Sequence, residues 1–216
     1  MDELQAVANH PIWHDGEESR GQYGYPVPAT PWKAGRWTWR NWKDLAARTV
    51  VVNDKGERYA LIEGIPEGEL YERNGIWCAK SPQSHLGPFL HAIDFLVPDG
   101  TPVLAAQNGT VKRFYDGDNE WGDGPRFSDK VNFMDIEHAC QYGEVTEYCH
   151  LAKGSVTALG IKWGDSVKKG QVIGMVGKTG WTDRDHLHFV VFRNDDHNSD
   201  NPLEGTKFKS LRVRFL

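Results

Sequence analysis

Asp185-His186-Leu187-His188-Phe189, followed by Val190-Val191-Phe192, is the stretch of this chain that most constrains its fold and its chemistry. On a β-strand, residues two positions apart point to the same face, with Cβ atoms about 6–7 Å apart. On a helix the same two side chains would diverge by about 200°. The β-branched and aromatic residues that follow favour a strand. We therefore predict that His186 and His188 face one site while Leu187 packs behind them.

The composition predicts a mainly β protein. The 216 residues include 23 glycines and 11 prolines, and long helical periodicity is absent. Strand-like segments recur from residue 92 onward, separated by turn signals such as Asn108-Gly109. They cover residues 92–97, 103–106, 110–115, 131–136 and 145–151, with two very short strands within 164–174.

Two regions differ in composition. Residues 1–80 are irregular and rich in tryptophan, and we expect them to pack on a domain formed by residues 81–216. A tryptophan-rich surface for carbohydrate is the alternative. The tryptophans of the first region are Trp13, Trp32, Trp37, Trp39, Trp42 and Trp77.

Charge and hydropathy exclude several classes of protein. A net charge of −5 argues against a nucleic-acid partner bound through a basic face. No run of 18 apolar residues exists, so no membrane span is expected. The first residues lack the basic and apolar segments of a secretion signal, so none is visible. The three cysteines have no C-x-x-C spacing, and we expect free thiols, with Cys149 facing away from His150 into the core.

Five side chains at strand ends or in loops can form a metal site. They are His85, Asp94, His150, His186 and His188. A zinc hydrolase needs three neutral or anionic protein ligands and one open position. Two histidines and one carboxylate meet that need, and two further histidines can move protons and stabilise an oxyanion.

The order of motifs resembles that of the lysostaphin-type zinc metallopeptidases, the β-lytic or LytM-like peptidoglycan endopeptidases. The resemblance covers roughly residues 84 to 192. The matching segments are Asp94-Phe95, Gly100-Thr101-Pro102-Val103, Ala105-Ala106, Gly109-Thr110-Val111, His150-Leu151, 164–171, Gly177-Lys178-Thr179-Gly180 and His186-Leu187-His188-Phe189. The His-Leu-His-Phe segment and the two Gly-Thr segments are specific when they occur together.

The resemblance implies a function and roles for these residues. Asp94 and His188 correspond to the second and third metal ligands, and His150 and His186 to the catalytic histidines. It further implies one zinc ion per chain, a small antiparallel β-sheet or sandwich-like fold with an open groove, and hydrolysis of peptide cross-links of bacterial peptidoglycan. The substrate would be peptidoglycan or a peptide containing glycine or D-Ala, and the site of action would lie outside the cytoplasm. The oligomeric state stays open.

The first ligand departs from the family pattern. The family has a histidine four residues before the aspartate, and this position holds Leu90 here. We expect His85 to replace it, from a loop that folds back over the site. His91 is the alternative, although a residue three positions from Asp94 on a strand faces the other side.

Two other functions compete with an active peptidase. The irregular first ligand allows a catalytically degenerate member of the same fold that binds cell wall or regulates another protein. The segment 164–171 is similar to the hairpin of lipoyl or biotinyl carrier domains, but it has no convincing modifiable lysine. Near the site, Asp183 and Asp185 are expected to be exposed loop acids, one of which can orient an imidazole. We expect His138 to be a turn or rim residue.

Overall fold

The computed structural model describes residues 17–28, 51–52, 58–61, 69–81, 84–139, 143–194 and 208–216. These residues form mainly β structure with three short 3-10 helices, η2 (Gly87–Phe89), η3 (Pro125–Lys130) and η5 (Thr157–Leu159). The strands are β1 (Val51–Val52), β2 (Arg58–Leu61), β3 (Glu69–Arg73), β4 (Ile76–Lys80), β5 (Ile93–Phe95), β6 (Pro102–Leu104), β7 (Gly109–Tyr115), β8 (Trp121–Gly122), β9 (Phe133–His138), β10 (Glu144–Cys149), β11 (Ser166–Val167), β12 (Val172–Met175), β13 (Gly180–Trp181), β14 (Leu187–Asn194) and β15 (Phe208–Leu211).

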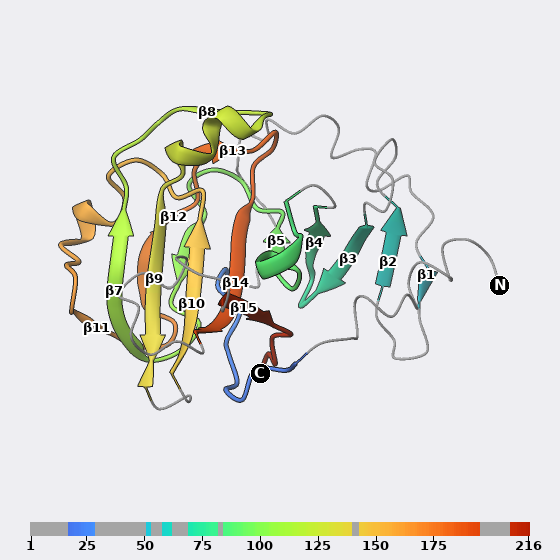
Figure 1. Cartoon of the computed structure of the whole chain (residues 1–216), viewed down its shortest axis with the longest axis horizontal. Helices are drawn as coiled ribbons and strands as arrows, with labels where there is room; N and C mark the ends of the chain where they lie inside the picture. The colour runs from blue at the N-terminus through green and yellow to red at the C-terminus, as the bar shows by residue number, and fades with distance from the viewer. Residues whose placement is uncertain are drawn as a thin grey trace.

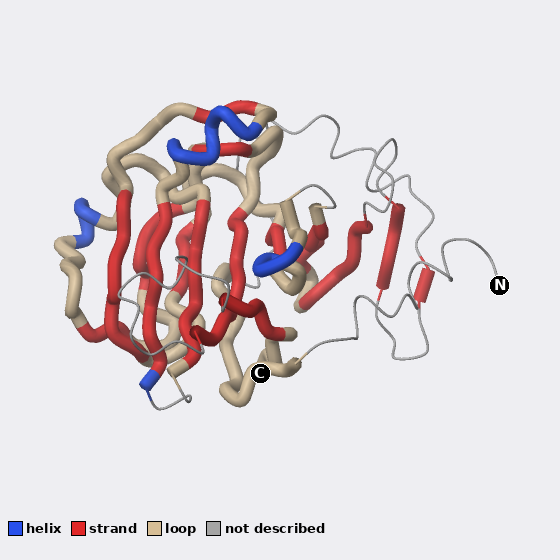
Figure 2. The backbone as a smooth tube through the Cα atoms, in the orientation of Figure 1, coloured by secondary structure: helices blue, strands red, loops and turns tan. Residues whose placement is uncertain are grey.

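One large antiparallel sheet organises the molecule. Its strand order is β1-β2-β3-β4-β5-β14-β10-β9-β7-β11, and β15 pairs with β14 outside this path. Two small sheets, β12-β6 and β13-β8, accompany it. Figures 1 and 2 show the strands of the large sheet running side by side, with β8, β13 and η3 across one end. The prediction of a mainly β, antiparallel fold is confirmed.

One face of the large sheet carries the apolar core, with buried polar groups such as Glu144 and His138 at its far end. Phe95, Met134, Tyr148 and Phe189 come from four neighbouring strands, and each is completely buried. Alternation along a strand places their chain neighbours on the opposite face. That opposite face carries Asp94 and His188, so the burial of the core fixes which side chains line the site.

Residues 17–28 form a strap that is held against the sheet. The carboxylate of Glu144, fully buried in β10, accepts hydrogen bonds from the backbone N–H groups of Arg20 and Gly21 and from the hydroxyl of Tyr23. Backbone hydrogen bonds also join the strap to the C-terminal segment, from Ser19 N–H to Arg212 O and from Tyr23 N–H to Arg214 O. Tyr23 itself belongs to the core.

The sheet continues across the predicted domain boundary at residue 80. Ala79 of β4 lies opposite Asp94 of β5, within one hydrogen-bonded sheet. The division into residues 1–80 and 81–216 stays a prediction, and Trp13, Trp32, Trp37, Trp39 and Trp42 lie outside the described residues. Within the described parts of the chain, no helix is long and apolar enough to cross a membrane.

Candidate metal centre and active site

Two of the expected ligands are a cross-strand pair. Asp94 in β5 lies directly opposite His188 in β14, and directly opposite residues of an antiparallel pair share one face. The third side chain comes from the loop before η2, where the backbone N–H of His85 donates to the carbonyl of Ser81. Despite a separation of nine residues in the chain, Nε2 of His85 lies 3.1 Å from Oδ1 of Asp94.

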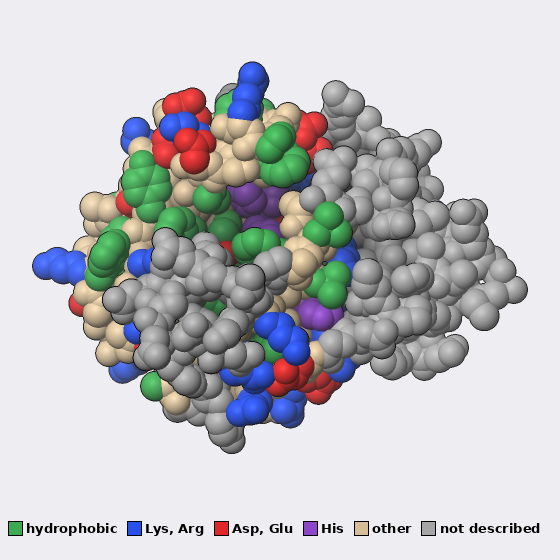
Figure 3. Space-filling model, in the orientation of Figure 1, with side chains coloured by type: hydrophobic (Ala, Val, Ile, Leu, Met, Phe, Trp, Pro, Cys, Tyr) green, Lys and Arg blue, Asp and Glu red, His purple; other side chains and the backbone are tan. Residues whose placement is uncertain are grey.

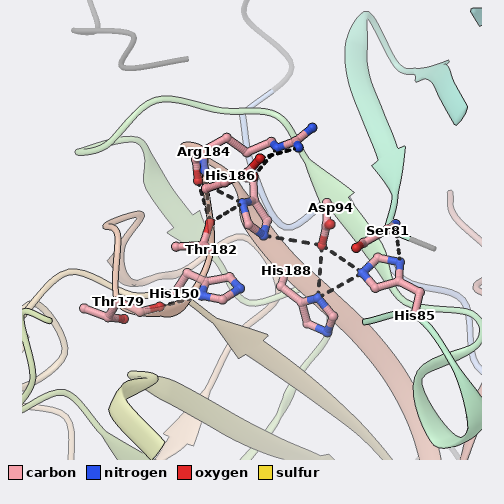
Figure 4. Close-up of polar contacts among 10 residues, drawn as sticks. Ser81, His85, Asp94, His150, Thr179, Thr182, Arg184, His186 and His188 are labelled. Atoms are coloured by element: carbon pink, nitrogen blue, oxygen red, sulfur yellow. Dashed lines mark hydrogen bonds and ion pairs between the residues drawn. The ribbon is translucent and has the colours of Figure 1, made fainter. Parts of the chain in front are cut away.

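The three ligand atoms form a nearly equilateral triangle (Figure 4). Oδ1 of Asp94 is 3.0 Å from Nδ1 of His188, and that nitrogen is 3.3 Å from Nε2 of His85. Each neutral imidazole carries one N–H, so protons can satisfy at most two of the three edges. Tetrahedral zinc with ligands at about 2.0–2.1 Å separates its ligand atoms by about 3.3 Å. The donor set therefore fits a small divalent cation.

Burial controls the protonation of this cluster. His85 is 1% exposed, and burial lowers its pKa although the Asp94 carboxylate opposes the shift. Burial alone would raise the pKa of Asp94, but the neighbouring imidazoles hold it well below its usual range. A neutral imidazole and an ionised carboxylate are the forms that bind a metal ion.

The second nitrogen of His85 has a less usual partner. The backbone N–H of Ser81 lies 3.3 Å from Nδ1, which makes that nitrogen an acceptor. A metal-bound histidine normally carries its proton on the nitrogen away from the metal. Metal binding at Nε2 would therefore place the proton on Nδ1 and release this long contact.

His150 and His186 lie beside the triangle with their rings 4.5 Å apart. His150 follows the end of β10 with φ of 63°, a left-handed backbone that turns it out of the strand. Its Nδ1 donates to the carbonyl of Thr179 at 2.6 Å. Nδ1 of His186 lies 3.1 Å from the carbonyl of Arg184 and its Nε2 lies 3.5 Å from Oδ1 of Asp94. These carbonyl partners fix the tautomers, so both rings present the lone pair of Nε2.

The same two imidazoles are kept neutral by their surroundings. Burial lowers the pKa of His150 well below its ordinary value, and the neighbouring imidazoles lower it further. Burial also lowers the pKa of His186, against the opposing effect of the Asp94 carboxylate. A neutral imidazole at this position is able to accept a proton.

The structure brings all five predicted site residues together and leaves His91 outside. The metal-binding group found among the described residues is His85, Asp94 and His188. The backbone N–H of His91 donates to Oγ of Ser210, and burial lowers the pKa of its imidazole to about 4.

An ion pair that the sequence did not reveal closes the loop between β12 and β14. Nζ of Lys178 lies 2.5 Å from Oδ1 of Asp185, and the two side chains are 6% and 0% exposed. The ammonium group also sits 4.6 Å from the ring centroid of Trp121. The loop between these partners supplies the Thr179 and Arg184 carbonyls that orient the imidazoles of His150 and His186. The expectation that Asp185 is an exposed acid was wrong.

Two further expectations need correction. His138 is fully buried rather than at a rim, with its ring nitrogens 2.8 Å from Asn108 O and 2.8 Å from Oγ1 of Thr146. Cys149 is buried as expected, but it lies opposite His188 and so faces the site. The expected alternation with His150 fails because His150 has already left the strand.

The site is open to one side. In the space-filling view, histidine side chains are visible at the bottom of a hollow below the β8, β13 and η3 end of the sheet (Figure 3). His188 is 9% exposed and His150 is 8% exposed, so little of either imidazole is accessible.

Comparison with known families identifies the fold around this site. Residues 89–201 match the model of peptidase family M23. The chain belongs to peptidase family M23. The matched range includes Asp94, His150, His186 and His188, whereas His85 lies just before it. The M23 match therefore does not decide between His85 and His91 as the first ligand, and the geometry favours His85.

The relatives similar to this chain include a protein named as a peptidoglycan endopeptidase. The peptidoglycan DD-endopeptidase ShyC of Vibrio cholerae is 32% identical over 118 residues, which are 55% of this chain and 23% of that protein. Lysostaphin of Staphylococcus simulans is 32% identical over 113 residues, which are 52% of this chain and 20% of that protein. The match thus spans about a quarter or less of the length of these relatives.

Solved M23 structures also align with the chain. The catalytic domain of lysostaphin from Staphylococcus simulans aligns with a TM-score of 0.36 and 30% sequence identity, over 51% of this chain and 70% of that domain. A putative M23 peptidase from Pseudomonas aeruginosa aligns with a TM-score of 0.36 and 30% identity, over 52% of this chain and 40% of that one.

Proposed function

We propose that this protein is a zinc-dependent endopeptidase that hydrolyses peptide cross-links of bacterial peptidoglycan. The observation that carries the proposal is the triangle of His85, Asp94 and His188 with two oriented imidazoles beside it. The names of the relatives ShyC and ShyB, both peptidoglycan DD-endopeptidases of Vibrio cholerae, support a wall substrate. Such a substrate implies action outside the cytoplasm.

His85, Asp94 and His188 would hold one zinc ion per chain. When bound, zinc supplies Lewis-acid polarisation and lowers the pKa of water towards neutrality. Two imidazoles and one carboxylate would leave a low net charge and room for a fourth ligand. The register of β5 against β14 keeps Asp94 and His188 in place without any movement of the backbone.

His150 and His186 would move the protons of the reaction. Each holds its Nδ1 proton towards a backbone carbonyl, so its Nε2 is available to accept a proton from the attacking water. One imidazole would take this proton and later pass it to the leaving amine. The other would take a proton from solvent at its Nε2 and donate it as a hydrogen bond to the oxyanion that develops on the scissile carbonyl. Each group contributes about 10²–10⁴ in rate in comparable enzymes.

The test separates catalysis from metal binding. His150→Ala should abolish release of peptide fragments from purified peptidoglycan while the zinc content stays near one ion per chain. His138→Asn removes another buried histidine outside the site and should retain activity per folded molecule. Loss of zinc together with activity in His150→Ala would contradict the assigned role. A wild-type protein that binds wall, holds no zinc and releases nothing would instead be a degenerate wall-binding module.

A further inference from the structure

Five side chains form a straight row that begins at the proposed metal centre. Asp94, His188, Cys149, Phe133 and Tyr115 are successive cross-strand partners on β5, β14, β10, β9 and β7. Directly opposite residues of antiparallel strands point to the same face of the sheet. The row therefore crosses the sheet at right angles to its strands, on the face that carries the site.

Exposure along this row increases away from the metal centre. His188 and Cys149 are each 9% exposed, Phe133 is partly buried, and Tyr115 is 45% exposed.

The next row on the same face is covered. Val190, Glu147 and Asp135 are the cross-strand neighbours two positions further along their strands, and they are 0%, 3% and 0% exposed. This covered row therefore bounds the row of Cys149, Phe133 and Tyr115 on one side. The bounded row leads from the catalytic histidines to Tyr115.

The ring of Tyr115 is held in place by the turn that follows β7. A Cβ atom at Gly117 would lie 2.9 Å from the Tyr115 hydroxyl oxygen and 3.0 Å from the adjoining ring carbon, so the ring packs against the glycine backbone. A hydrogen bond to Asp118 also raises the pKa of the Tyr115 hydroxyl. An exposed aromatic ring that is fixed in this way loses little conformational freedom when a ligand stacks on it.

We propose that this row binds one extended peptide arm of the substrate and that Tyr115 contacts a residue about four positions from the scissile bond. The proposal rests on the proposed function. Three strand spacings of about 4.8 Å separate His188 from Tyr115, which is about 14 Å. An extended peptide spans about 3.3–3.6 Å per residue, so four residues cover this distance. The thiol and the two aromatic rings of the row carry no charge, so they suit an uncharged arm.

A series of synthetic cross-link peptides without sugars tests the proposal on the zinc-loaded full chain. The peptides are extended by one residue at a time on each side of the scissile bond. For the wild type, KM should fall about fivefold to tenfold when the fourth residue is added on one side, the gain expected for stacking on one aromatic ring. Tyr115→Ala should lose this gain and Tyr115→Phe should keep it. Trp163→Ala removes a 66% exposed aromatic outside the row and serves as the matched control.

The possible failures are distinguishable. Equal KM values for wild type and Tyr115→Ala at every length would overturn the peptide arm while leaving the peptidase function intact. An effect of Tyr115→Ala that requires a disaccharide on the substrate would also overturn it, since the ring would then bind sugar. If the wild type cleaves neither the peptides nor purified peptidoglycan, the proposed function fails. Equilibrium binding of the longest peptide to wild type and Tyr115→Ala then decides whether the row binds peptide at all.

Discussion

Breaking the buried ion pair between Lys178 and Asp185 should destabilise the protein far more than breaking a surface pair. Replacing Asp185 by alanine leaves the Lys178 ammonium in a position where its side chain is 6% exposed. The ring of Trp121, 4.6 Å away, and the half-buried carboxylate of Asp99 compensate only in part. The perturbation therefore removes the direct ion-pair partner of a buried ammonium group.

The expected loss in free energy of unfolding is about 3–5 kcal/mol, the range found when one partner of a buried pair is deleted. This is a fifth or more of the stability of a typical domain, about 5–15 kcal/mol. Replacing both partners by apolar residues of similar volume, as in Lys178→Met with Asp185→Leu, should restore most of the loss because no buried charge remains.

Urea unfolding followed by tryptophan fluorescence measures the difference. With an m-value of about 2 kcal/mol/M, the midpoint of Asp185→Ala should fall by about 1.5–2.5 M. The pair Lys112–Glu137 is the matched control, because its side chains are 51% and 37% exposed at a separation of 3.2 Å. Glu137→Ala should lose less than about 1 kcal/mol. Equal losses for Asp185→Ala and Glu137→Ala would refute the reasoning.

Three other perturbations give distinct results. His85→Ala should lose zinc at stoichiometric metal concentration, whereas His91→Ala should keep one ion per chain. Elemental analysis of the dialysed proteins measures this. The reverse result would make His91 the ligand. Burial lowers the pKa of His91 from 6.5 to about 4, so the unfolded chain binds more protons between these values and stability falls as pH drops through that window. In His91→Asn, the free energy of unfolding measured in urea should differ less between pH 4.5 and pH 7 than in the wild type. An equal difference in the two proteins would contradict this. Glu144→Gln weakens a charged acceptor of three hydrogen bonds and should lower the free energy of unfolding by about 1.5–3 kcal/mol. A loss below about 0.5 kcal/mol would show that other contacts hold the strap.

The sequence predicted the parts of the site that depend on strand periodicity. The spacing of His186 and His188 placed both imidazoles at one site, and Leu187 is fully buried behind them. The strand candidates around Asp94 and His150 correspond to β5 and β10. Periodicity is local, so it survives into the structure wherever a strand is regular.

The features that were missed depend on contacts between distant residues or on irregular backbone. The left-handed conformation of His150 ended the alternation that was used to place Cys149 in the core. The pairing of Lys178 with Asp185 requires the loop between them to close, and no pattern in the sequence signals that closure. The row that leads to Tyr115 follows from sheet register, which is visible only once the strands are paired.

The most direct test of the central claim is a crystal structure of the zinc-loaded protein with anomalous data collected on both sides of the zinc absorption edge. We expect one strong peak about 2.0–2.2 Å from Nε2 of His85, Oδ1 of Asp94 and Nδ1 of His188. A peak that includes His91 in place of His85, or a zinc-loaded protein with no peak between Asp94 and His188, would contradict it.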